Sequence, residues 1–130
     1  KVVLDQYVAT SYPFFYRQTQ LEEQDMTAVE QDLIGIPHTE VGGKLADGLC
    51  LADNLRDVIV HHHYPEKAAV SPTLTHLVYL ADLLMSRFRV NLELENINTD
   101  LFASRLQKLG ITLAQFPKII DLMPRTVLLS

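Results

Sequence analysis

Residues 36–48 read Ile-Pro-His-Thr-Glu-Val-Gly-Gly-Lys-Leu-Ala-Asp-Gly. Pro37 suits the first turn of an α-helix, and Gly48 is a typical residue just past a helix end. One face of the stretch carries residues at the i, i+3, i+4 and i+7 spacing of a helix, namely His38, Val41, Gly42 and Leu45. The stretch therefore predicts a helix from Pro37 to about Ala46 that presents a histidine from its first turn.

The same start and stop signals recur on both sides of this stretch. Thr27 and Glu30 fit a capping box that opens a short helix, and Gly35 ends it. Ser71 followed by Pro72 is a strong start for a long helix. The apolar spacing in that helix predicts its buried side, which consists of Leu74, Leu77, Val78, Ala81, Leu84 and Met85.

We expect an all-α bundle of about seven helices with short connections. Residues 90–97 alternate apolar and polar side chains as a strand does, but the segment is isolated and is interpreted as an extended loop. The expected helices are Val2–Arg17, Thr27–Ile34, Pro37–Ala46, Asp53 to the histidines before Pro65, Pro72–Phe88, Asp100–Leu109 and Thr112–Met123.

The length and composition of the chain exclude several classes of protein. A chain of 130 residues with 48% hydrophobic residues has the size and core of one domain. A net charge of −5 without a basic stripe argues against nucleic-acid binding. The apolar runs are too short to span a bilayer, and a lone Cys50 favours a reducing cytoplasm. Because Lys1 opens inside an apolar run, we expect a fragment of a longer protein.

Three histidines and one aspartate are candidate metal ligands: His38, His62, His63 and Asp82. Imidazole and carboxylate are common ligands of divalent transition metals. Asp82 interrupts an apolar run, where a carboxylate needs a metal, a cation or several hydrogen bonds. Successive helical residues differ by about 100°, so one of the three adjacent histidines must point away, and we expect it to be His61. The structural alternative is a histidine that interacts with a helix dipole and an aspartate that faces water.

The order of these motifs resembles the HDOD branch of the HD superfamily. In that family a run H-x-E-V-G-x-x-L is followed by a helix ending in I-x-x-H-H-x-P and then by a helix containing L-A-D. The corresponding stretches here are His38–Leu45, Ile59–Pro65 and Leu80–Asp82. Glu30–Gly35 also resembles the E-x-x-x-x-G stretch that precedes the family's histidine. The resemblance covers residues 25–85.

The resemblance implies an HD-type helical bundle, in which residues 1–130 form a single domain that is the C-terminal portion of the family's domain. It also implies a divalent metal (Mn, Fe, Mg, Ni or Zn) at His38, His62, His63 and Asp82. The chain has no His-Asp dipeptide, the family's ligand pair, and no G-Y-P signature after its paired histidines. We therefore expect an incomplete site. The opening Lys-Val-Val-Leu resembles the stretch that follows the family's H-D-x-G, which would place the pair upstream of Lys1.

Two functions follow from this resemblance. The one we favour is a regulatory signal-transduction domain, as in bacterial HDOD output modules, without intrinsic catalysis or catalytic residues in this chain. Its partners would be other signalling proteins or domains of the parent chain, and a homodimer is a further hypothesis because a fragment exposes apolar surface. The alternative is a portion of a metal-dependent phosphohydrolase. A purely structural scaffold would follow if His38 and Asp82 lay too far apart to share an ion.

Three further residues have simple interpretations. Gly42 is expected where the helix of His38 crosses another helix. Glu40 could be hydrogen-bonded to a ligand histidine, although a solvated glutamate is the simpler interpretation. Cys50 is expected to be a small core residue rather than a nucleophile.

Overall fold

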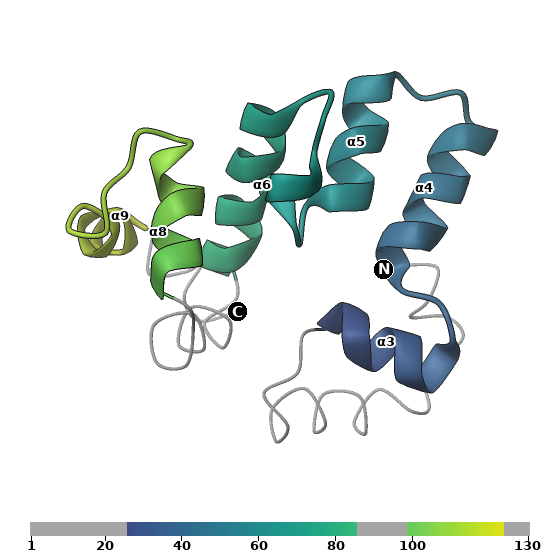
Figure 1. Cartoon of the computed structure of the whole chain (residues 1–130), viewed down its shortest axis with the longest axis horizontal. Helices are drawn as coiled ribbons and strands as arrows, with labels where there is room; N and C mark the ends of the chain where they lie inside the picture. Colours follow the sequence, from purple (N-terminus) through teal and green to yellow (C-terminus); the bar gives the residue numbers. More distant parts are fainter. Residues whose placement is uncertain (1–25, 86–98, 124–130) are drawn as a thin grey trace. The chain divides into compact units, whose positions relative to one another are not determined.

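The computed structural model describes residues 26–85 and 99–123, which form α-helices and one 3₁₀ turn without any strand (Figure 1). The predicted all-α class is therefore confirmed. The predicted helix Val2–Arg17 and the predicted loop at residues 90–97 lie outside the described residues. The chain divides into two units, residues 1–60 and 61–130, which are described separately. No described helix has both the length and the apolar character that a membrane span requires.

The first unit contains α3 (Met26–Ile34), α4 (His38–Gly48) and α5 (Asp53–His61). Gly35 ends α3 as predicted, because its positive φ of 81° reverses the chain and its N–H donates to the Gln31 carbonyl. Glu30 does not form the predicted capping box. Thr27 lies inside α3, and the Glu30 carboxylate accepts a hydrogen bond from the backbone of His38 instead.

The end of α4 differs from the prediction. Gly48 is the last residue of the helix, and the left-handed position falls two residues later, at Cys50 with a φ of 51°. The Cys50 N–H donates to the Asp47 carbonyl, and the Leu51 N–H donates to the Ala46 carbonyl. This pair of bonds is the Schellman motif, which usually places glycine where Cys50 stands. Cys50 is exposed, so its expected place in the core is wrong.

Two glycines let α4 and α5 approach closely. A Cβ atom built on Gly42 would lie 2.5 Å from Ile59 Cγ2, and one built on Gly43 would lie 2.9 Å from Val60 Cγ2. The expectation that Gly42 marks a helix crossing is therefore confirmed. At the other end of the pair, Arg56 of α5 donates to the Asp47 carboxylate at 2.5 Å. Its hydrogen bond and positive charge hold the pKa of Asp47 below the ordinary value.

The second unit contains the 3₁₀ turn η1 (Pro65–Lys67) and the helices α6 (Pro72–Met85), α8 (Thr99–Gln107) and α9 (Phe116–Leu122). Pro72 starts α6 as predicted, whereas α8 ends at Gln107, two residues before the predicted Leu109, and Gly110 follows it with a φ of 71°. Phe102 and Phe116 meet edge to face with ring centroids 5.0 Å apart. These rings form the core of the unit together with Tyr79, Leu80, Leu83 and Leu106.

The buried side of α6 is not the predicted one. Leu74, Leu77 and Met85 are 37%, 54% and 61% exposed. The residues that α6 buries are instead Thr75, His76, Tyr79, Leu80 and Leu83. Because α6 carries apolar residues around most of its circumference, the spacing alone left its orientation open. The large side chains Tyr79 and Leu83 decide it by packing into the core with Phe102.

A buried arginine links α8 to η1. Arg105 is 7% exposed and forms two hydrogen bonds of 3.1 Å with the Glu66 carboxylate. Its guanidinium also lies 4.7 Å from the centre of the Tyr79 ring. Such a fork-shaped contact fixes the spacing of two elements as well as adding charge attraction.

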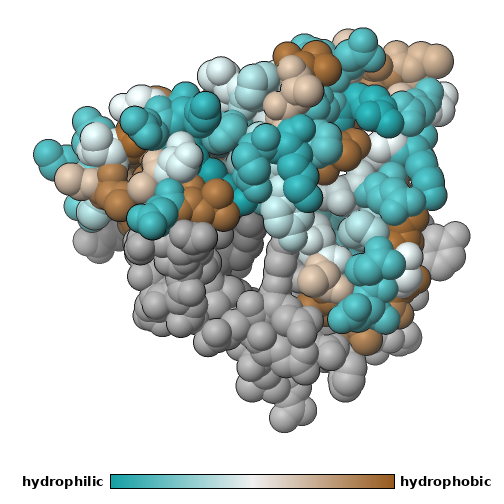
Figure 2. All heavy atoms as spheres, in the orientation of Figure 1, coloured by the Kyte–Doolittle hydropathy of each residue, from teal (hydrophilic) through white to brown (hydrophobic). Residues whose placement is uncertain are grey.

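Apolar side chains are also present on the surface. Figure 2 shows them at several separate places among hydrophilic residues on the face that it presents. Among the described residues of the first unit, Leu33 of α3 is exposed, and four more exposed leucines lie close in sequence around the connection from α4 to α5, namely Leu45, Leu49, Leu51 and Leu55. Leu45, which the sequence places on the same helix face as His38, and Leu55 are both 47% exposed.

Candidate metal centre

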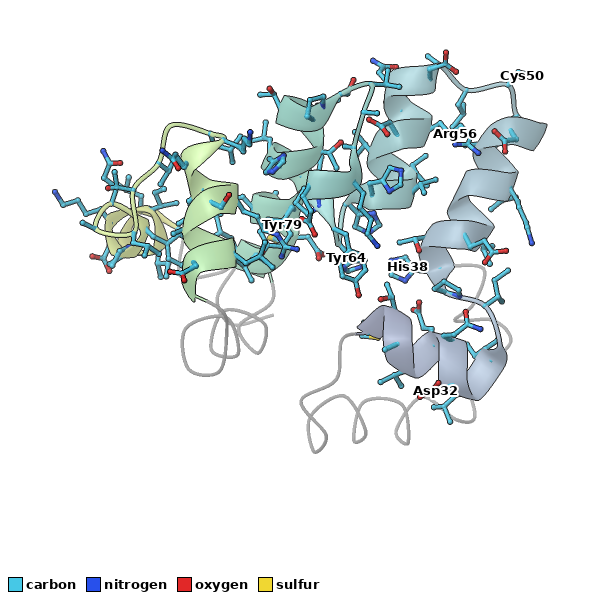
Figure 3. All side chains as sticks on the ribbon, in the orientation of Figure 1. Asp32, His38, Cys50, Arg56, Tyr64 and Tyr79 are labelled. Carbon is cyan, nitrogen blue, oxygen red and sulfur yellow. The ribbon has the colours of Figure 1, made fainter. Side chains whose placement is uncertain are left out.

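His38 is the first residue of α4, and its side chain lies between α4 and α3 (Figure 3). It is 9% exposed, and Glu30 of α3 is 4% exposed. His38 Nδ1 lies 2.6 Å from Glu30 Oε2, and the His38 backbone N–H donates to the same oxygen at 2.8 Å. The ring is therefore held on its Nδ1 side by a buried carboxylate, so Nε2 is the atom that it can offer to a metal.

His62 and His63 directly follow the last residue of α5. Their rings lie side by side, with centroids 4.3 Å apart and planes tilted by 40°. His63 is 7% exposed and His62 is half-buried. The next element begins at Pro65, which cannot continue an α-helix because it has no N–H to donate. The proline thus explains why the chain leaves the helix at the histidine pair.

His38, His62 and His63 form a group that could hold a metal ion. One ring nitrogen of each histidine lies within 4.8 Å of the others. Nitrogen ligands bind zinc at about 2.0–2.1 Å, which separates tetrahedral ligands by roughly 3.4 Å. A shared tetrahedral ion would therefore need the three nitrogens at about this closer spacing. The prediction of a shared divalent metal is supported to this extent, and it rests on three of the four expected ligands.

The other expected residues stand apart from this group. His61 is not a member of this group, and the expected direction of its ring stays a prediction. Asp82 is half-buried in α6 and is also not a member, so its role as a ligand stays a prediction. Glu40 is exposed and pairs with Lys44 at 2.9 Å, which fits the solvated interpretation.

The sequence interpretation assigned Glu30 to a helix capping box, whereas in the structure it contacts His38. Within the short helix its spacing from Thr27 matched a local capping box, and a contact eight residues away leaves no periodic signal. The available clue was the E-x-x-x-x-G-x-x-H spacing, in which a helix and a tight turn can carry the glutamate back to the histidine.

No protein-family model, curated protein or solved structure matches this chain. The chemistry of the site therefore rests on its own residues. Three imidazoles without a carboxylate among them form a neutral ligand set, which suits zinc, iron, nickel or copper better than magnesium. Three protein ligands also leave coordination positions for water or for a further ligand.

Proposed function

We propose that this chain is a signal-transduction domain of the HDOD type, in which a divalent metal at His38, His62 and His63 supports regulated protein contacts rather than catalysis. The observation that carries the proposal is the approach of the three ring nitrogens to within 4.8 Å of one another. A metal bound there would tie the start of α4 to the residues that follow α5. It would thereby favour one arrangement of these segments over others.

The ligand set is the reason for which we expect no catalysis by this chain. The chain contains no His-Asp dipeptide, and the described group contains no carboxylate. A metal with neutral ligands alone keeps its full positive charge, which favours binding of an anionic group from a partner. We therefore expect metal binding and partner binding to be coupled, with phosphoester hydrolysis lacking.

The test is a titration of the purified chain with zinc, manganese and nickel by calorimetry, together with elemental analysis of the protein as isolated. His38→Ala and His62→Ala should each weaken zinc binding at least about 100-fold, since a three-ligand site loses a third of its donors. His61→Ala is the matched control, because it removes a neighbouring imidazole that is not a member of the group. Equal affinities in all four proteins would rule out this site.

A portion of a metal-dependent phosphohydrolase is the second candidate, because three protein ligands with open positions are typical of catalytic metal sites. When bound, a divalent ion would supply Lewis acidity to a phosphoester. His38, His62 and His63 would hold it, and Asp82 would complete the set. Hydrolysis of a generic phosphodiester by the full-length protein with manganese, abolished by Asp82→Ala, would favour this candidate. Activity unaffected by that change would exclude Asp82 from the site.

A further inference from the structure

We propose that Glu30 is the positioning residue of the metal centre: it fixes the His38 ring in the tautomer that turns an unprotonated Nε2 toward the ion. The inference rests on the proposed metal-binding function and adds to it a residue outside the ligand set. It concerns α3 and α4 of the first unit alone. The observation behind it is one carboxylate oxygen that contacts both the ring and the backbone of the same histidine.

The geometry restricts both partners. Glu30 Oε2 accepts the His38 backbone N–H at 2.8 Å, and this bond holds the carboxylate at the start of α4. The same oxygen lies 2.6 Å from His38 Nδ1. The ring therefore cannot swing away without breaking a short bond to a group that is itself held. With both side chains at least nine-tenths buried, water does not compete strongly for either partner.

The chemistry selects one tautomer. An ionised carboxylate has lone pairs and no proton, so the nitrogen that faces it must carry the N–H. In a neutral imidazole the proton on Nδ1 leaves the lone pair on Nε2, which is the form that binds a metal. A carboxylate behind a ligand histidine also makes the imidazole a stronger donor, and removal of such a partner typically lowers metal affinity 10–100-fold.

The position of Glu30 at the start of α4 adds a second effect. The first N–H groups of a helix have no partner within it, and Pro37 at the N-cap offers no side-chain acceptor. Glu30 supplies one, and its negative charge faces the positive end of the α4 dipole. The carboxylate is thus stabilised in place by the helix that carries the ligand.

The experiment compares Glu30→Gln with Glu40→Gln. Glu40 is the matched control, because it lies on α4 two residues after His38 but is exposed and paired with Lys44. Two quantities are measured. The first is the tautomer of His38 in the metal-free chain, read from the nitrogen-15 shifts of its ring at a pH where the imidazole is neutral. The second is the zinc dissociation constant from calorimetry, with circular dichroism to verify folding.

We expect the proton of His38 on Nδ1 in the unaltered chain and in Glu40→Gln, with equal zinc affinity. Glu30→Gln can present an amide N–H to the ring, so we expect a mixture of tautomers and a 10–100-fold larger dissociation constant. A proton on Nε2 in the unaltered chain would overturn the inference, and this measurement needs no variant to fold. So would a folded Glu30→Gln with unchanged zinc affinity.

The two proposals fail in different ways. If the unaltered chain binds no zinc but His38 carries its proton on Nδ1 and loses this preference in Glu30→Gln, the metal-binding function fails while the positioning of the ring by Glu30 holds. If zinc binds with the same affinity to both Glu30→Gln and Glu40→Gln, the positioning role fails while the metal centre holds.

Discussion

The two units are both helical, yet their described helices bury different kinds of side chain. In the second unit an apolar cluster with three aromatic rings fills the core. Among residues 26–60 of the first unit, Val29 is the one large apolar side chain that is fully buried, and the other buried residues are small or polar. The buried residues of α3, α4 and α5 are Thr27, Val29, Glu30, His38, Gly43, Ala46 and Asp57.

The two kinds of buried side chain have different consequences: apolar burial stabilises the fold, whereas short polar contacts fix the position of His38. Burial of apolar area is the main favourable term in folding, so the aromatic core provides most of what the described helices contribute. The contacts among α3, α4 and α5 include short polar bonds and a close approach of backbones, which set positions accurately.

The largest expected effect is on the core of the second unit. Phe102→Ala removes a fully buried ring that contacts Phe116 edge to face, and it should cost about 3–5 kcal/mol of unfolding free energy. Val29→Ala, at the most buried apolar position of α3, should cost about 1–2 kcal/mol. Urea unfolding followed by circular dichroism measures both. Equal losses would show that the two units are packed alike.

The fold was predictable where single residues impose a conformation. Pro72 marks the start of α6, and Gly35 marks the end of α3, because their backbone preferences are local. The buried side of α6 was not predictable, since apolar residues surround the helix and the choice depends on α8. The end of α4 was missed because a cysteine occupies a position that glycine usually takes.

The candidate site was predictable to the level of its three histidines. His38 and the pair His62 and His63 were identified by residue type and order, and the group in the structure contains all three. The contact of Glu30 with His38 depends on the turn between α3 and α4, which no periodicity encodes. His38 belongs to the first unit, whereas His62, His63 and Asp82 belong to the second, and the part of Asp82 in the site stays a prediction.

The close approach of α4 and α5 gives a second test of the comparison. Gly42→Ala places a Cβ against Ile59 Cγ2, a stiff β-branched side chain, so the helices must separate. We expect a loss of about 1–3 kcal/mol in stability. Zinc affinity should fall about tenfold or more, because metal–ligand distances tolerate only about 0.2 Å.

Gly48→Ala is the matched control for this change. It alters a glycine of the same helix, but an added Cβ there meets nothing within 4 Å. It should raise stability by up to about 1 kcal/mol through helix propensity and leave zinc affinity unchanged. If Gly42→Ala behaves like Gly48→Ala, then the glycine contact does not position the histidines.

Lowering the pH should reduce the stability of the second unit, because it protonates the Glu66 carboxylate. Burial raises the pKa of Glu66, but hydrogen bonds from Arg105 and from its own backbone outweigh this, and the net pKa lies below the ordinary value. A carboxylate with a lowered folded-state pKa stabilises the fold above its unfolded pKa and loses that contribution as the pH falls through the folded pKa.

The measurement is the unfolding free energy at pH 6.5 and at pH 3. Because the Glu66 side chain is 41% exposed and partly screened, the unaltered chain should lose about 1 kcal/mol more than Glu66→Gln over this interval. Glu40→Gln, which removes an exposed carboxylate of the first unit, should follow the unaltered chain. An identical pH dependence in Glu66→Gln would mean that the contact with Arg105 adds no stability.

The smallest expected effect is at the end of α4. Gly35 and Gly110 occupy left-handed positions after their helices, whereas Cys50 adopts a φ of 51° at a cost that glycine avoids. Cys50→Gly should therefore raise the unfolding free energy by about 0.5–1 kcal/mol. The gain from removing the backbone strain is partly offset, because glycine has more conformational freedom in the unfolded chain. Cys50→Ser keeps the strained backbone and also removes the exposed thiol, so it should stay within about 0.5 kcal/mol of the unaltered chain. A glycine variant no more stable than the serine variant would show that the motif after α4 tolerates a side chain without strain, and that the first unit is limited by its sparse apolar packing alone.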